Sequence, residues 1–245
     1  MGFESVLQEY FDSVITETDF IAKSYTALSR FGFTGENTIA SLCVCRDEIA
    51  QSVSSIIARI WGEAFNLSSL AGMCFAGRTA LLAVTHHAPG ADGRERYVYY
   101  ALPHIAIRGK GCVGICARKG IEDSTACGAL NAFQKELGER DKGVGRGVPL
   151  PAPLDPDDIE YSLMSARLFR EIPCGHVPDL LELTRISQRV IRADLDHALS
   201  RIVDPHKSDH ALITGIQIHG PDDNYIWPGD SYAMVDGNRL AIEVT

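Results

Sequence analysis

The segment that most constrains the fold joins an apolar run to a helical pattern through a short polar turn. The run begins at Thr38 and leads into Cys45, Arg46 and Asp47, and residues 49–60 then continue with apolar side chains at helical spacing. This order predicts a buried strand, a tight turn and a helix. In open α/β sheets, ligands bind beyond the carboxyl ends of the strands. The turn that contains Cys45 and Asp47 is therefore the predicted site.

Composition limits the classes of protein that the chain can belong to. It has 245 residues, of which 45% are hydrophobic and 22% charged, so we expect residues 1–245 to form a single globular domain. The formal net charge of -9 argues against a nucleic-acid groove, which needs a basic face. No apolar stretch approaches the roughly 20 residues that span a bilayer. We expect a soluble protein with no membrane span and no nucleic-acid partner.

Seven cysteines bear on the compartment; they lie at positions 43, 45, 74, 112, 116, 127 and 174. An odd number, without a secretory apolar segment at the start, favours reduced thiols over a disulfide framework. The first residues also lack the Arg- and Ser-rich character of a transit peptide. We expect a reducing compartment, either the cytoplasm or a plastid stroma.

Outside the predicted site, strand patterns alternate with helical ones. Residues 1–37 predict a helical N-terminal arm of two helices, packed on the sheet or on a partner subunit. Residues 79–85 are continuously apolar over a strand's length, which predicts a buried parallel strand ending at His86 and His87. Residues 138–158 are rich in glycine, proline and charge and predict a long loop. The other predicted elements are strands within residues 96–107, 112–116 and 211–219, and helices within residues 159–203.

Cys45, His104 and Cys127 are the metal ligands that the sequence favours. Each is predicted at a strand end or a helix start; Asp123 or Ser124 would cap a helix whose first turn holds Cys127 and favours its thiolate. Zinc accepts two thiolates and one imidazole and keeps a fourth position for water. The alternative is that the cysteines are small buried hydrophobes and the histidine is a hydrogen-bonded core residue.

Further cysteines and histidines leave other possibilities open. Cys43 shares a strand face with Cys45, so it is a possible ligand or a redox partner of Cys45. His86 or His87 is suited to be a ligand or to pass protons, because imidazole titrates near neutral pH. The sequence Cys174-Gly175-His176 suits a metal site or a rigid turn between helices, and the flanking prolines favour the turn.

Several motifs resemble known families. Cys45-Arg46-Asp47 and Ala126-Cys127-Gly128-Ala129 resemble the two cysteine elements of β-carbonic anhydrases. Longer segments resemble the low-CO2-inducible protein B (LCIB) family, which is related to the theta-class carbonic anhydrases. These segments are Phe65–Gly72, Gly93–Tyr100, Pro103–Ile105, Ser124–Leu130 and Cys174–Leu180.

The resemblance implies a fold, an activity and a role for each site residue. It implies a β-carbonic-anhydrase-like α/β fold with a mostly parallel central sheet flanked by helices, assembled as a homodimer. It implies Zn2+ held by Cys45, His104 and Cys127, and reversible hydration of CO2 to bicarbonate by metal-bound hydroxide. Asp47 would orient the zinc-bound water and His86 would line the pocket. In the mechanism we expect, His86 or His87 passes the proton to buffer. The alternatives are a catalytically silent, zinc-stapled subunit of a carbon-concentrating assembly and a thiol redox protein.

Two departures from the β-class pattern affect these roles. The β-class has its ligand histidine three residues before the second cysteine, where this chain has Ser124. His104 must therefore arrive from the preceding strand, across an inserted hairpin, which leaves His86 or His87 possible in its place. The β-class also pairs its aspartate with an arginine two residues on, where this chain has Ile49. Arg46 or an arginine elsewhere must then partner Asp47.

Overall fold

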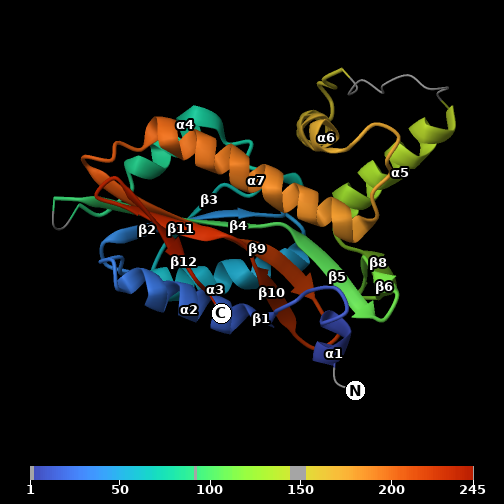
Figure 1. The fold of residues 1–245 in the computed structure, drawn as a ribbon, viewed down its shortest axis with the longest axis horizontal. Coiled ribbons are helices and arrows are strands. Elements are labelled where there is room, and N and C mark those ends of the chain that lie inside the picture. Colours follow the sequence, from blue (N-terminus) through green and yellow to red (C-terminus); the bar gives the residue numbers. More distant parts are fainter. Residues whose placement is uncertain (1–2, 91–92, 144–152, 245) are drawn as a thin grey trace.

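The computed structural model describes residues 3–90, 93–143 and 153–244, and a mixed sheet of ten strands forms the centre of this part of the chain (Figure 1). The parallel centre consists of β3 (Ala64–Asn66), β2 (Thr38–Val44), β4 (Glu95–Leu102) and β9 (Ser208–His219), in that spatial order. Antiparallel strands complete it: β10 (Asn224–Pro228) and β1 (Ile15–Thr16) on one side, β11 (Ser231–Val235) and β12 (Asn238–Ile242) on β9. The predicted α/β class with a mostly parallel centre is confirmed.

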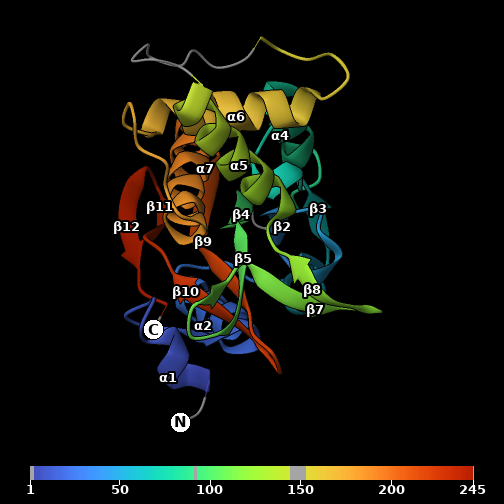
Figure 2. The same ribbon diagram turned by 90° about the vertical axis from the view of Figure 1, so that its right-hand side faces the viewer.

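Helices cover both faces of the sheet. One face carries α2 (Glu17–Ser29) and α3 (Gln51–Trp61), and the other carries α4 (Gly77–Thr85) and α7 (Leu180–Ile202) (Figure 1). Next to α7 lie α5 (Gly128–Gly143) and α6 (Ile159–Glu171) (Figure 2). Alternate strand residues point to opposite faces, so Cys43 joins the apolar cluster that includes α7, while Leu42 and Val44 join the cluster that includes α2 and α3. Every residue of β2 is therefore buried, which explains its continuous apolar sequence.

Two predicted helices of the N-terminal arm are present, α1 (Phe3–Leu7) and α2. The hydroxyl oxygen of Thr16 caps α2 by accepting the backbone N–H of Asp19. Phe3 and Phe11 lie against the rings of Tyr225 and Trp227, at centroid distances of 5.9 and 6.1 Å. The arm therefore packs on the sheet of its own chain.

Residues 79–85, which the sequence predicts to be a strand, belong instead to helix α4. Leu81 and Val84 are buried while Leu82, between them, is 36% exposed. Burial at a spacing of three is the pattern of a helix with one face on the core. The short strand β3 takes the place beside β2, through Ala40 and Ala64.

The segment between β4 and α5 also differs from the prediction. Pro103 interrupts the predicted strand, and β5 (His104–Gly109) follows along the same side of β9. Short strands then return: β6 (Cys112–Val113), β7 (Ile115–Arg118) and β8 (Ile121–Thr125). Asp123 and Ser124 therefore lie in a strand rather than capping a helix, and α5 begins after Cys127. The start of the predicted loop at 138–158 is helical to Gly143, and residues 144–152 of it lie outside the described residues.

Two further predictions of secondary structure are confirmed. Residues 159–203 form α6 and α7, and the predicted strand at residues 211–219 lies within β9. In the described part of the chain, no helix combines the length and apolar character needed to cross a membrane.

Candidate metal centre

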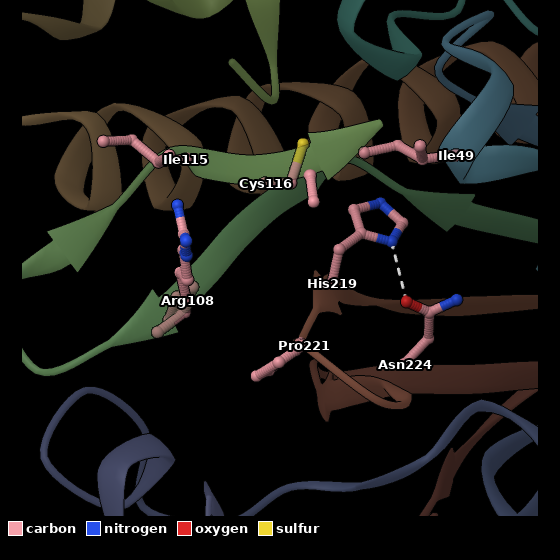
Figure 3. A pocket seen from close by; sticks show the side chains of 10 residues that line it. Ile49, Arg108, Ile115, Cys116, His219, Pro221 and Asn224 are labelled. Carbon is pink, nitrogen blue, oxygen red and sulfur yellow. Dashed lines mark hydrogen bonds between the residues drawn. The ribbon is translucent and has the colours of Figure 1, made fainter. Parts of the chain in front are cut away.

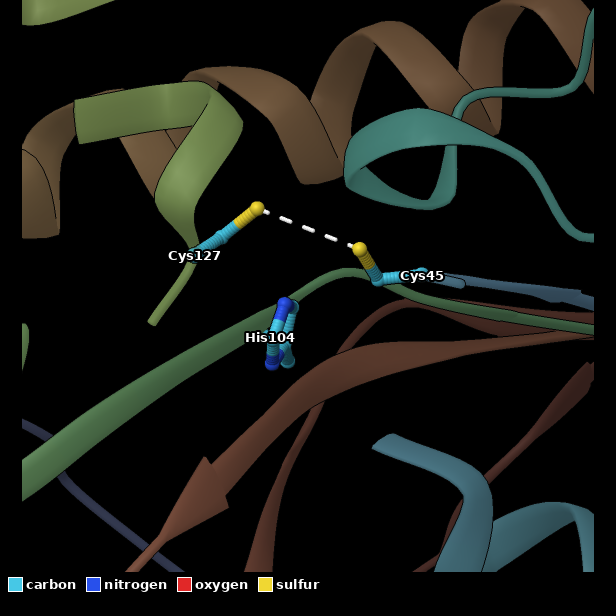
Figure 4. Close-up of side chains that lie close together, drawn as sticks. All are labelled: Cys45, His104 and Cys127. Atoms are coloured by element: carbon cyan, nitrogen blue, oxygen red, sulfur yellow. Dashed lines mark hydrogen bonds between the residues drawn. The ribbon is translucent and has the colours of Figure 1, made fainter. Parts of the chain in front are cut away.

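Three segments from distant parts of the sequence meet at one end of the parallel strands. Val44 on β2 and Leu102 on β4 are register partners, so the residues that follow them leave the sheet at the same end of the parallel strands. Cys45 directly follows β2, His104 opens β5, and Cys127 directly precedes α5 (Figure 4). All three are buried, and one ligand atom from each lies within 4.8 Å of the others. The predicted ligand set is thus brought together.

The spacing and chemistry of these donors fit zinc. The two sulfur atoms, of Cys45 and Cys127, are 3.9 Å apart. Two thiolates at zinc–sulfur distances of about 2.3 Å in a tetrahedron lie about 3.8 Å apart. His104 Nε2 is buried with no hydrogen-bond partner in the described chain. Such an atom costs roughly 1–3 kcal/mol, a cost that coordination to a metal would remove.

Without metal, the two thiols share a proton unequally. The hydrogen bond with Cys127 lowers the pKa of Cys45 to about 4, although burial opposes this. The same hydrogen bond and burial raise the pKa of Cys127. The first backbone groups of α5, those of Ala129 and Leu130, act in the opposite direction on Cys127 and favour its thiolate. The prediction that Cys127 lies in the first helical turn and is a thiolate is therefore wrong for the metal-free protein: Cys127 precedes α5, and the helix start only partly offsets the rise in its pKa.

Asp47 lies beside the cluster and is clamped by an arginine. Its Oδ2 is 3.8 Å from His104 Nε2. Arg118 donates from Nη1 to Oδ1 and from Nη2 to Oδ2, both at 2.7 Å, and Nη2 also donates to the carbonyl of Thr125 at 2.9 Å. Burial would raise the pKa of Asp47, but the hydrogen bonds of Arg118 and the nearby His104 hold it below its ordinary value. Asp47 is therefore an ionised carboxylate in a fixed orientation.

The partner of Asp47 is Arg118, a residue that no motif in the sequence indicates. It lies at the end of β7, in the hairpin inserted between His104 and Cys127. Arg46, the neighbour of Asp47 in sequence, instead forms an ion pair with Glu160 at 2.7 Å, and its side chain is 63% exposed. The one available signal was the inserted hairpin itself, because its arginines are close in sequence to both remaining ligands.

Two further side chains, those of His219 and Asn224, are hydrogen-bonded in series to Nδ1 of the His104 ring. Nδ1 of His104 is 3.0 Å from Nε2 of His219, and Nδ1 of His219 is 3.0 Å from Oδ1 of Asn224. Burial lowers the pKa of His219 to about 3, so its ring is neutral at neutral pH. With Nδ1 engaged by His219, Nε2 is the nitrogen of His104 that is left for a metal.

The other histidine and cysteine candidates lie elsewhere. His86 and His87 are exposed at the end of helix α4 rather than at a strand end, and the His87 ring lies 5.4 Å from that of Phe65. Cys43 interacts with Cys74, which raises the pKa of Cys43, while the pKa of Cys74 is lowered. The exposed pair His176 and Glu182, 2.9 Å apart, supports the turn between α6 and α7.

Comparisons with known proteins agree with this arrangement. The mixed α/β fold, with two cysteines and a histidine at one end of its parallel strands, is β-carbonic-anhydrase-like. The sequence model of the limiting CO2-inducible proteins B/C β-carbonic anhydrases matches residues 14–235. The chain therefore belongs to this family.

Solved structures and curated sequences were compared as well. The crystal structure of limiting CO2-inducible protein LCIB is 32% identical, with a TM-score of 0.79 and 97% of each chain covered. PtLCIB4, a homologue of LCIB, is 20% identical and has a TM-score of 0.78 over 97% of this chain and 98% of its own, which supports the fold alone. No curated protein sequence matched.

Proposed function

We propose that this protein is a carbonic anhydrase that binds Zn2+ through Cys45, His104 and Cys127 and interconverts CO2 and bicarbonate. The observation that carries this proposal is the buried three-donor cluster beside an aspartate clamped by Arg118. Membership of a carbonic anhydrase family supports the same reaction. Zinc, when bound, would lower the pKa of a water molecule at the site to about 7.

The clamp on Asp47 favours an active site over a silent one. Arg118 occupies one lone-pair direction on each Asp47 oxygen, which holds the carboxylate as an acceptor for a water proton rather than as a fourth metal ligand. Three protein donors leave one tetrahedral position open, the arrangement of catalytic rather than structural zinc. Asp47 then fixes which lone pair of the water faces the substrate.

The surroundings of the cluster suit an apolar substrate. Leu67 is buried and Phe65 and Leu70 are partly buried, within the same apolar cluster as Cys45 and Cys127. Such walls exclude bulk water and strengthen the electrostatic interactions inside. We assign to this wall the binding of CO2, and to the exposed His86 the passage of the released proton to buffer, because imidazole often performs this step near neutral pH.

Zinc content and stopped-flow CO2 hydration on one purified sample test the proposal. We expect about one zinc per chain and turnover that an anion inhibitor abolishes. Cys127→Ser should lose zinc and turnover together, while Cys174→Ser, at an exposed cysteine, should keep both. Stoichiometric zinc without turnover would instead favour a zinc-stapled, silent subunit of a carbon-concentrating assembly. Absence of zinc from the reduced protein would refute the ligand set.

A second variant separates metal binding from water orientation. Asp47→Ala should retain zinc but lose most turnover, because the donors remain and the acceptor is gone. An unchanged rate would remove Asp47 from the reaction. The homodimer implied by the family resemblance is part of the same proposal, and light scattering on the zinc-loaded protein tests it.

A further inference from the structure

We propose that Asn224, acting through His219, determines which ring nitrogen of His104 carries the proton, and so presets His104 Nε2 to bind the metal. Asn224 and His219 are positioning residues in this proposal. It rests on the proposed zinc site but not on CO2 turnover.

The hydrogen-bond directions are set at Glu17, whose ionised carboxylate can only accept; burial raises the pKa of Glu17, and the hydrogen bonds from Gln217 and Ser52 oppose this and favour the ionised form. The Glu17 carboxylate is buried at the start of α2 and accepts the hydroxyl of Ser52 at 2.9 Å. Gln217 donates to the same carboxylate. Because the Ser52 hydroxyl donates to Glu17, its oxygen is left as an acceptor, which receives Nδ2 of Asn224 at 3.2 Å.

The donor and acceptor roles fixed at Ser52 determine the roles of Asn224, His219 and finally His104. With the amide nitrogen of Asn224 turned to Ser52, its Oδ1 faces His219 Nδ1, which must carry the proton. A neutral imidazole has one N–H, so Nε2 of His219 is an acceptor. His104 Nδ1 must then donate to it. The lone pair of His104 therefore lies on Nε2, the atom with no hydrogen-bond partner in the described chain.

The chain also fixes the orientation of the His104 ring. His104 is fully buried, and its ring lies edge-to-face with that of His219, at a centroid distance of 5.2 Å. β5 and β9 hold the two residues in place, because His104 is the register partner of Gln217 and His219 lies two residues further along β9. His219 and Asn224 line a pocket of about 340 Å³ together with Ile49 and Cys116 (Figure 3). Cys45, His104 and Cys127 are not among the residues that line this pocket, so a different side chain at Asn224 has space that the candidate ligands do not border.

The tautomer can be measured directly in the metal-free protein. Nitrogen-15 NMR of the imidazole rings distinguishes Nδ1–H from Nε2–H, and we expect His104 and His219 both in the Nδ1–H form, which free histidine disfavours. A His104 ring with its proton on Nε2 would overturn the proposal. This measurement needs no variant and no turnover, so its failure is distinct from failure of the proposed function.

Variants then test the effect on metal affinity. Asn224→Leu removes the acceptor, and we expect His219 to leave the Nδ1–H form and the zinc dissociation constant to rise about 10- to 100-fold, the usual effect of losing such a partner. Asn224→Asp retains an acceptor and should restore the tautomer and most of the affinity. Arg108 lines the same pocket but takes no part in the hydrogen bonds from Asn224 to His104. Arg108→Gln should therefore change neither the His219 tautomer nor the zinc affinity. A loss of affinity equal in Asn224→Asp and Asn224→Leu would contradict the proposal, as would unchanged affinity in Asn224→Leu.

Discussion

Arg118 binds Asp47 through two parallel hydrogen bonds of 2.7 Å, although 71 residues separate them in the sequence. A third hydrogen bond, from Arg118 to the carbonyl of Thr125, ties the turn after β2 to the segment that leads to Cys127. One guanidinium group therefore holds the aspartate and links two of the segments that carry the buried Cys45–His104–Cys127 cluster. Bidentate geometry of this kind requires arginine, because lysine is a point donor.

Replacing Arg118 should therefore lower turnover with zinc retained. We expect Arg118→Gln to reduce kcat/KM by about 10- to 100-fold, the range typical for partners that orient a metal site. Arg46→Gln is the matched control, because Arg46 forms its ion pair with Glu160, and it should change turnover little. If Arg46→Gln caused the larger loss, the role expected for Arg46 from the sequence would stand in place of that of Arg118.

The identity of the histidine ligand is tested by zinc analysis of two alanine variants. His104→Ala should lose zinc, because His104 supplies the one imidazole in the buried cluster found among the described residues. His86→Ala should keep zinc and lose only the rate of proton release, an effect that high buffer concentration should relieve. Zinc loss in His86→Ala with retention in His104→Ala would reverse the assignment.

The metal-free protein should contain a thiolate at Cys45 over an unusually wide pH range. The pKa of Cys45 is lowered to about 4, chiefly by the hydrogen bond from Cys127. The ultraviolet absorbance of this thiolate should therefore persist as pH falls from about 8 and disappear near about 4. Subtracting the absorbance of Cys45→Ser from that of the wild type separates the Cys45 thiolate from that of Cys74, whose pKa is also lowered. A difference spectrum that vanishes near the ordinary cysteine pKa would contradict this assignment.

Because Gly72 has no side chain, the segment after β3 can pack closely against the backbone of Cys45 and Pro103. Its φ is +76°, and a Cβ there would lie 3.4 Å from the Cα of Pro103 and 3.5 Å from the backbone nitrogen of Cys45. We expect Gly72→Ala to lower the free energy of unfolding by about 1–2 kcal/mol, the cost of a left-handed conformation for a residue with a Cβ. Urea denaturation measures this change. Gly138→Ala, in the interior of α5 with open space around it, should instead be stabilising by up to about 1 kcal/mol.

Local patterns in the sequence determined most of the secondary structure around the site. The apolar run to Val44, the turn at Cys45 and Asp47, and the helix beyond it were all predicted, because burial and helical spacing are written in neighbouring residues. The motifs also indicated Cys45, His104 and Cys127, which the structure brings together as a group that could hold a metal ion. Residues 79–85 were predicted wrongly, because a short apolar run does not distinguish a buried strand from a helix with one buried face.

Only the tertiary structure decided the partners of these groups. Arg118 reaches Asp47 because the β7–β8 hairpin folds back, and His219 reaches His104 because β5 follows β4 along the same side of β9. Neither contact leaves a periodic signal, since each depends on the register of strands that are distant in sequence. The sequence by itself therefore specified the donors and the strand end that presents them. Their orientation, protonation and ion pairing come from hydrogen bonds that form only when the sheet assembles.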